Sequence, residues 1–382
     1  MLVHALAPPL PGGTPVVLRR LLTGLPGVRL EVVTDLVVRS RVKAGGSDVL
    51  PGRYRYFFKW PGWGGRWRWG RYVVAGIDLV LAVVAGVRAA RWARRDGVRW
   101  VMSVTDDGFS PVAGAVAARL ARCPHVVMVF DLWEENAYSE ARRALARRLE
   151  GPIFRSAAKV VGYCEEIAEH FAAKHGIDAT FIRTPIDPGP APSPMRDRDG
   201  RDAELLMAGA LYWMQEDAVK RLLRVTPSVP GLRTVAMAPP EQLAITDARF
   251  DAVEQPVPVE RFRDRLERAD VLFLGLSFDC EHPLLARFST PARLTDYLAA
   301  ARPLLVHAPA ESHVARYCRR EGLAEVVDAP DEGQLRAALQ RILDDPEAAQ
   351  ARAQRAREHL ERVHAVPVVR ERFADLLSEL AR

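Results

Sequence analysis

A serine, a threonine and a proline precede an arginine in the run FSTPARLTDYLAAARP, residues 288–303. Pro291 has no backbone N–H to leave unpaired, which suits the first turn of a helix, and Ser289 or Thr290 can cap that helix. The first amides of a helix carry partial positive charge, and Arg293 adds a full charge on the first turn. These residues predict a site for an anion such as a phosphate. The alternative is that Ser289 only caps the helix and Arg293 is a solvated side chain.

The sequence pattern around this run predicts the strands and helices that surround it. An apolar strand pattern, DVLFLGLS, precedes it at residues 270–277, and most of the chain alternates such runs with helical patterns. This rhythm is typical of parallel, doubly wound sheets. A segment rich in proline, glycine and charge interrupts it at 184–203, which we expect to be a linker. We predict an α/β protein of two Rossmann-like domains facing across a cleft, 1–183 and 204–363.

Composition excludes several other classes of protein. With 382 residues, 49% hydrophobic and 27% charged, the chain suits two packed domains. Its four cysteines are widely spaced and form no CxxC pair, which indicates neither a disulfide framework nor a zinc site and favours a reducing compartment. The N-terminus predicts a first strand rather than a signal peptide. The most apolar stretch, residues 72–87, is shorter than the roughly 20 residues of a membrane span and contains Asp78, so we expect a buried helix.

The net charge indicates that the protein favours anionic partners, but it does not choose among the kinds of anionic partner. The net charge is +6, with a sequence pI near 9.3. This balance favours anionic partners such as nucleotides, phosphates or acidic lipid surfaces.

The run at 288–303 also resembles the donor-side signature of GT-B glycosyltransferases of the GT4 kind, S-x-P-x-K-L-x-E-Y-L-A-x-G-x-P. Ser289 and Pro291 match this signature, with Arg293 in place of its lysine and Asp296 in place of its glutamate. Three further features extend the resemblance over most of the chain. They are ELLMAGALYWMQEDAVKRLL at 204–223 with the turn glycine at Gly209, VVMVFDLWEEN at 126–136, and the glycine turn at Gly12 and Gly13.

The resemblance implies a hexosyltransferase-like enzyme that moves a sugar, with retention, from a nucleotide diphosphate sugar to a glycan, lipid-linked or small-molecule acceptor. It implies a role in polysaccharide biosynthesis, no obligatory metal and no further cofactor. It also implies that a C-terminal helix, about 364–382, packs back on the first domain. Phe130 stands where many relatives have a histidine, and basic residues are missing just after Gly209. Two alternatives therefore stay open: a catalytically silent GT-B partner subunit and a GT-B nucleotide-sugar epimerase.

The donor residues follow from the same resemblance. Departure of the diphosphate leaves a charge that preorganised donors stabilise, and Arg293 is the catalytic candidate for that role. Asp296 would accept hydrogen bonds from the ribose hydroxyls. Lys220 is a second phosphate candidate, and its alternative is a solvated helix lysine. The donor-binding candidates are Gly12, Gly13, Gly209, Lys220, Ser289, Thr290, Pro291 and Asp296.

Asp131 is the second catalytic candidate. It ends an apolar strand pattern and could contact the acceptor or the donor sugar, or it could cap a helix. Glu134 and Glu135 are expected to be acids at a helix start. We predict no metal site: the pair Asp106 and Asp107 suits a turn, the pair Asp197 and Asp199 lies in the linker, and the nine histidines lack ligand spacing.

An aromatic and basic segment, residues 52–72, suits contact with a membrane interface or an anionic lipid-linked acceptor. A nucleic-acid stacking surface and a buried aromatic loop are the alternatives. We expect a cytoplasmic protein, peripheral at the inner face of the membrane, with no nucleic-acid partner. The acceptor or membrane candidates are Trp63, Arg66, Trp67, Arg68 and Trp69.

Overall fold

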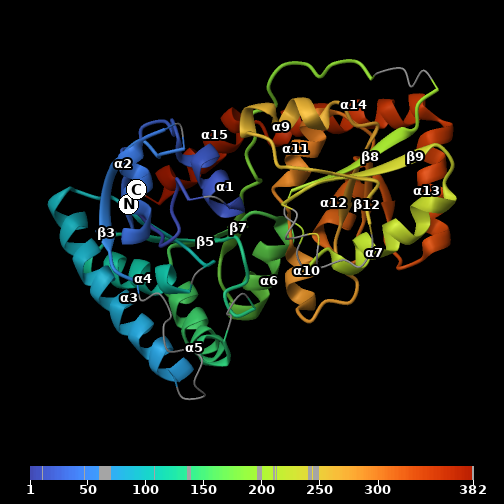
Figure 1. Ribbon diagram of the computed structural model, residues 1–382. Helices are drawn as coiled ribbons and strands as arrows, with labels where there is room; N and C mark the ends of the chain where they lie inside the picture. Colours follow the sequence, from blue (N-terminus) through green and yellow to red (C-terminus); the bar gives the residue numbers. More distant parts are fainter. Residues whose placement is uncertain are drawn as a thin grey trace. The chain divides into compact units, whose positions relative to one another are not determined.

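The structure is a computed structural model, in which the chain divides into two compact units (Figure 1). Unit 1 comprises Met1–Pro185 and Val366–Arg382, and unit 2 comprises Ile186–Ala365. The segments by which the chain enters and leaves unit 2 lie side by side, because the Ile186 N–H donates to the His364 carbonyl at 2.9 Å. The residues described are 1–10, 12–46, 48–59, 70–106, 108–135, 139–195, 200–209, 211, 213–239, 243 and 249–380.

Unit 1 is built on a seven-stranded parallel sheet with the order β3-β2-β1-β4-β5-β6-β7. Its strands are β1 (Leu2–Val3), β2 (Glu31–Asp35), β3 (Arg53–Phe57), β4 (Val101–Val104), β5 (His125–Val129), β6 (Lys159–Gly162) and β7 (Ala179–Phe181). Its helices are α1 (Gly13–Leu22), α2 (Arg39–Ala44), α3 (Gly70–Arg95), α4 (Phe109–Ala121), α5 (Glu140–Ser156), α6 (Glu165–His175) and α15 (Val366–Glu379), with a 3-10 turn at Leu36–Val38.

Unit 2 is built on a six-stranded parallel sheet with the order β10-β9-β8-β11-β12-β13. Its strands are β8 (Ala203–Ala208), β9 (Leu232–Met237), β10 (Ala252–Glu254), β11 (Val271–Gly275), β12 (Leu304–His307) and β13 (Glu325–Val327). Its helices are α7 (Glu216–Val225), α9 (Val259–Leu266), α10 (Pro283–Phe288), α11 (Arg293–Ala300), α12 (His313–Glu321), α13 (Glu332–Asp344) and α14 (Pro346–Val363), with a 3-10 turn at Thr226–Ser228.

The central strands explain why both sheets form. β4 and β11 are buried at every position, as expected for parallel strands covered by helices on both faces. In each sheet the strand order reverses beside the first strand of the unit, between β1 and β4 in unit 1 and between β8 and β11 in unit 2. Ligands of open α/β sheets bind beyond the carboxyl ends of the strands at such a reversal. The topology therefore points to two edges, one in each unit.

The last helix belongs to unit 1, although the chain before it belongs to unit 2. α15 packs on α1, and the Arg370 guanidinium donates to the Arg20 carbonyl at 2.8 and 3.0 Å. The helical sequence from about residue 331 onward is thus divided into α13, α14 and α15.

Two expectations need correction, and one strand was not predicted. The apolar stretch 72–87 is part of the 26-residue α3, and it is not a buried helix, because one of its faces is exposed. The helix of the 288–303 run begins at Arg293 rather than at Pro291. The sequence pattern does not predict β3, because its sequence RYRYF is mostly polar. β3 lies at the edge of the sheet, where a strand can be polar.

Candidate functional site

The turn after β8 lies against the first turn of α11. Gly209 has a φ of +97°, a conformation that favours glycine. The Arg293 guanidinium donates to the Ala208 carbonyl at 3.1 Å, and a Cβ on Gly209 would lie 3.5 Å from the Arg293 Cζ. The buried Tyr297 hydroxyl donates to the same carbonyl at 3.0 Å and accepts the Ala208 N–H at 2.8 Å. Two residues of α11 thus fix the glycine turn, and a guanidinium stands beside it.

The residues before α11 do not cap it. Ala292 occupies the N-cap position without a side-chain hydrogen bond, and Ser289 is the C-cap of the preceding α10. The expectation that Ser289 or Thr290 caps this helix is therefore wrong, because α11 begins only at Arg293 and its N-cap position falls on Ala292. The Thr290 Oγ1 is buried without a hydrogen-bond partner among the described residues. A hydroxyl in that state is available to a ligand.

A second cation, absent from the sequence predictions, lies on α7. Arg221 is 8% exposed, and its guanidinium approaches the His307 Nε2 at 3.1 Å and the Asp217 Oδ2 at 3.6 Å. Its Cζ lies 5.1 Å from the centre of the Phe278 ring, which in turn packs on the His307 ring at 4.6 Å. His307 ends β12 and Phe278 follows β11, so Arg221 lies at the carboxyl edge of the unit 2 sheet.

The protonation state of His307 suits this arrangement. Its Nδ1 lies 3.0 Å from the Val327 carbonyl, so Nδ1 carries the proton and Nε2 accepts from Arg221. Burial, with a contribution from the Arg221 charge, lowers the pKa of His307 to about 4. The ring is neutral at neutral pH, and Arg221 keeps its positive charge at this edge.

The other two predicted donor residues lie on the same two helices. Lys220 is next to Arg221 on α7 and pairs with Glu216 at 2.7 Å. Asp296 lies in the first turn of α11 and is partly exposed. The sequence thus predicts Lys220 as a phosphate-binding residue, whereas the buried cation on this helix is the neighbouring Arg221.

In unit 1 the predicted glycine turn leads into α1. Gly12 is the N-cap, with a φ of +139°, and Gly13 is the first helical residue. A Cβ on Gly13 would meet no atom of the described residues within 4 Å. The backbone at Gly13 is therefore open on one side.

The carboxyl edge of the unit 1 sheet carries acidic groups. Asp131 follows β5, and its carbonyl accepts the Thr105 hydroxyl at 2.7 Å. Burial and the nearby carboxylate of Asp106 raise the pKa of Asp131 to about 7. The His4 Nδ1 lies 3.5 Å from an Asp106 oxygen, and neither ring nitrogen of His4 has a hydrogen-bond partner among the described residues.

The alternative of a helix cap at Asp131 does not hold, because the N-cap of α5 is Ser139. Glu134 and Glu135 are likewise not helix-start acids: the first-turn acid of α5 is Glu140. Glu134 instead pairs with Arg147 at 2.6 Å.

A cavity of about 160 Å³ opens beside this acidic edge, between α3, α4 and α5. Its wall is mostly apolar, and it includes the ion pair of Asp78 and Arg142 at 2.5 Å. The second oxygen of Asp78 is buried without a hydrogen-bond partner among the described residues. The residues that line it include Ala75, Asp78, Leu79, Ala82, Trp133 and Arg142.

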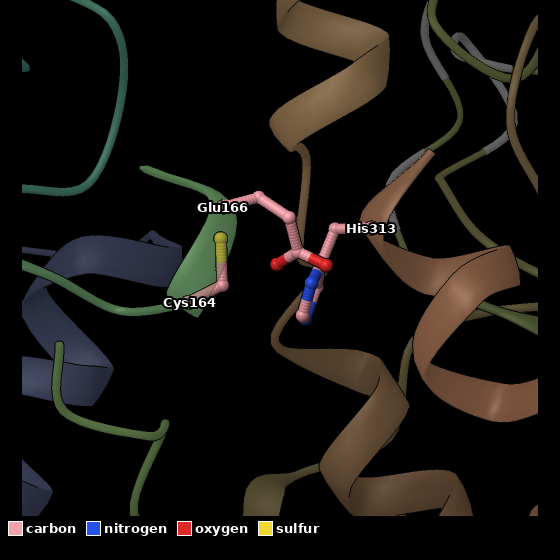
Figure 2. Close-up of side chains that lie close together, drawn as sticks. All are labelled: Cys164, Glu166 and His313. Carbon is pink, nitrogen blue, oxygen red and sulfur yellow. The ribbon is translucent and has the colours of Figure 1, made fainter. Parts of the chain in front are cut away.

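Cys164 and Glu166 stand at the start of α6 in unit 1 (Figure 2). Burial raises the pKa of the Cys164 thiol far above its usual range, so the thiol stays protonated. His313, also labelled in Figure 2, begins α12 in unit 2, where its ring stacks on Tyr317 at 5.5 Å.

Several predicted residues lie outside the described part of the chain. These are Trp63, Arg66, Trp67, Arg68 and Trp69 of the aromatic segment, with Asp107, Asp197 and Asp199.

Comparison with solved structures gives matches that span the whole chain. Anabaena Alr3699/HepE in complex with UDP-glucose matches with a TM-score of 0.70 and 12% identity over 99% of both chains. The lipopolysaccharide outer core galactosyltransferase WaaB matches with a TM-score of 0.65 and 13% identity, again over 99% of both chains. Sucrose-phosphate synthase of Thermosynechococcus elongatus matches with a TM-score of 0.66 and 14% identity over 99% of this chain and 95% of that one.

The chain has the GT-B fold. Its two parallel-sheet α/β units are the two Rossmann-like domains of that fold, as the sequence predicts. No family model matches the sequence, and no curated protein matches it.

Proposed function

We propose that this GT-B chain is a glycosyltransferase that moves a sugar from a nucleotide diphosphate donor to a hydroxyl of an acceptor. The observation that carries the proposal is the contact of Arg293 with the turn at Gly209, at the strand reversal of unit 2. The solved Anabaena structures of the same fold hold UDP, UDP and glucose, or UDP-glucose, which makes a UDP-sugar the first donor to test.

The chemistry of the donor explains the charges at this edge. When the sugar leaves, the diphosphate gains negative charge and the sugar carbon becomes cation-like, so fixed cations near the leaving oxygens lower the barrier. Arg293 supplies one such cation and Arg221 a second. Thr290 offers a hydroxyl that has no hydrogen-bond partner among the described residues, and Asp296 accepts from the ribose. We propose a hexosyl transfer that proceeds without a metal ion, since two guanidinium groups provide the charge.

We assign the acceptor to unit 1. The cavity beside Asp106 is walled mostly by apolar groups, and its wall includes an Asp78 oxygen that has no hydrogen-bond partner among the described residues. It suits an apolar group that carries a hydroxyl, and its volume is close to the roughly 150 Å³ that holds a benzene ring. Lipid-linked and small-molecule acceptors both contain such groups, and growth of a polysaccharide on a lipid carrier fits the first class.

Asp131 orients the acceptor hydroxyl in this account. We propose transfer with retention, in which the departing diphosphate accepts the hydroxyl proton and Asp131 accepts only a hydrogen bond. An inverting transfer would instead need Asp131 as the base, and loss of a general base costs about 10²- to 10⁴-fold in rate. The anomer of the product, read by NMR, separates the two roles.

We further propose that the protein acts in the cytoplasm at the inner face of the membrane. The support is the sequence of the aromatic segment, with Trp63, Trp67 and Trp69 between arginines.

A thermal-shift panel tests the donor proposal. UDP-glucose, UDP-galactose, GDP-mannose and dTDP-glucose are compared with the matching nucleoside monophosphates. A ligand at a hundred times its dissociation constant adds about 2.7 kcal/mol to the stability of the folded state. Stabilisation by one nucleotide sugar and its diphosphate, with little from the monophosphate, supports the proposal.

Two results would replace the proposal with an alternative. Stabilisation by no nucleotide sugar favours a silent partner subunit. Interconversion of one nucleotide sugar into its epimer, without an acceptor, favours an epimerase.

A further inference from the structure

One face of α3 is apolar and exposed. The exposed fractions are 60% for Val73, 62% for Val80 and 48% for Val84. These residues are spaced by seven and four positions, so they lie on one face of the helix. Tyr72 and Val83, 58% and 40% exposed, lie at the side of that face. A face of this kind is unusual on a soluble protein and marks a surface that binds a partner or a membrane.

The opposite face of α3 is part of the packing of unit 1. Ala85 and Ala89 are buried where α3 runs along α4. A Cβ on Gly86 would lie 2.7 Å from the Ala113 carbonyl, so the two helices are in close contact. Among the described helices, α3 alone is long and apolar enough to cross a membrane by length and composition, with a mean hydropathy of 2.1 over 18 residues. Spanning would expose the buried Asp78 to lipid, so α3 can lie on a membrane but does not cross one.

The exposed face changes from apolar to cationic along the helix. Arg91 follows Val84 by seven positions and Arg95 by eleven, so both continue the same face, and Arg88 lies beside them. All three arginines are exposed, and Arg95 also pairs with Asp96 at 3.2 Å. The single acid of α3, Asp78, is on the buried side in its ion pair with Arg142. The face therefore offers apolar contact and positive charge together.

We propose that this face of α3 docks the protein on an anionic lipid surface. Its valines would enter the boundary between head groups and acyl chains, and its arginines would contact lipid phosphates. A second copy of the chain fits less well, because the face carries no exposed acid to pair with the arginines of another α3. The inner side of the same helix walls the cavity assigned to the acceptor, through Ala75, Leu79 and Ala82. A lipid-bearing acceptor would then need to move only a short way from the bilayer.

Flotation with liposomes tests the docking surface. The wild-type chain is mixed with vesicles of phosphatidylcholine alone or with 30% phosphatidylglycerol, a composition chosen for roughly physiological anionic charge. The triple variant Val73→Ser, Val80→Ser, Val84→Ser should bind the anionic vesicles about 10- to 100-fold more weakly, because partly buried valines are lost. Arg88→Ala with Arg91→Ala should weaken binding about 30-fold at low salt. The matched control is Val253→Ser with Val368→Ser, two valines 50% and 43% exposed outside α3.

Each outcome decides the proposal. Binding to anionic vesicles that the α3 variants lose and the control keeps supports it. Failure of the wild type to bind, or equal binding by wild type and the valine variant, overturns it. A wild-type dimer in light scattering that the valine variant dissociates, without vesicle binding, assigns the face to a second copy instead. Far-UV circular dichroism checks the fold, and Val80→Ser alone replaces the triple variant if it unfolds. Stabilisation by nucleotide sugars should not change, so this result is separate from the donor test.

Discussion

The carboxyl edges of the two sheets have the same topology and opposite electrostatics. In unit 2 the strand reversal is bordered by two arginines, Arg221 and Arg293. In unit 1 the corresponding edge carries Asp106 and Asp131 beside an apolar cavity. The sheet topology indicates where a ligand would bind in each unit, whereas the side chains determine which ligand would bind there. The contrast supports the proposal that an anionic donor binds to unit 2 and a hydroxyl-bearing acceptor to unit 1.

The largest expected effect concerns the buried cation of unit 2. Arg221→Met should lower the free energy of unfolding by about 3 kcal/mol, because Asp217 loses the opposite charge that it faces and the His307 Nε2 loses its hydrogen-bond donor. Chemical denaturation measures this. The matched control is Arg224→Met one turn later, where the arginine is exposed and pairs with Glu332 at the surface, so the change should stay below about 1 kcal/mol. Equal losses in the two variants would show that Arg221 is not a buried structural charge.

The second effect is a pH dependence of stability that arises from Asp131 in unit 1. The pKa of Asp131 is raised from 3.8 to about 7 in the folded state. The folded state therefore loses stability as pH rises from about 4 through 7, because the charged form is disfavoured by burial and by Asp106. Since the side chain keeps some exposed surface, we expect a loss of about 1 to 2 kcal/mol rather than the full shift.

Asp131→Asn tests this by removing the titrating group. Relative to the wild type, the variant should gain about 1 to 2 kcal/mol between pH 4 and pH 8. Denaturant unfolding at both pH values measures the difference, with His4 and Asp106 left in place. A difference that does not change with pH would mean that Asp131 ionises normally and that unit 1 lacks the proposed proton-linked carboxyl.

The smallest effect distinguishes neighbouring cations on α7. Lys220 pairs with Glu216 at the surface, so Lys220→Ala should change UDP affinity less than threefold and stability by less than about 0.5 kcal/mol. A larger loss of UDP affinity would restore Lys220 as a phosphate ligand and weaken the assignment of that role to Arg221.

The elements of the fold that are set by local pattern were predictable from sequence. Buried parallel strands such as β4 and β11 carry continuous apolar runs, and the runs alternate with helical patterns. The proximity of Arg293 to Gly209 follows from motifs that lie on two elements of one sheet edge. Such features depend on residues near one another in sequence or on a known arrangement of strands.

The other features depend on contacts between distant segments. Arg221 occupies a position on α7 where its partner His307 is 86 residues away, so nothing local distinguishes it from Lys220. Nearly every residue at 72–87 is apolar, so the sequence does not reveal which face of α3 packs on α4 and which stays exposed. The cap expected at Ser289 failed because α10 extends to Phe288.

Calorimetric titration of UDP into the full chain and two variants tests whether the diphosphate binds at the edge of unit 2. Arg293→Ala removes the guanidinium beside Gly209, and Arg287→Ala removes an exposed arginine of α10 as the matched control. The account predicts that the wild type binds one UDP, that Arg293→Ala weakens binding by about 1.5 to 3 kcal/mol, roughly 10- to 150-fold, and that Arg287→Ala stays within twofold. Affinity for UDP within twofold of the wild type in Arg293→Ala would contradict the assignment of the diphosphate to the edge of unit 2.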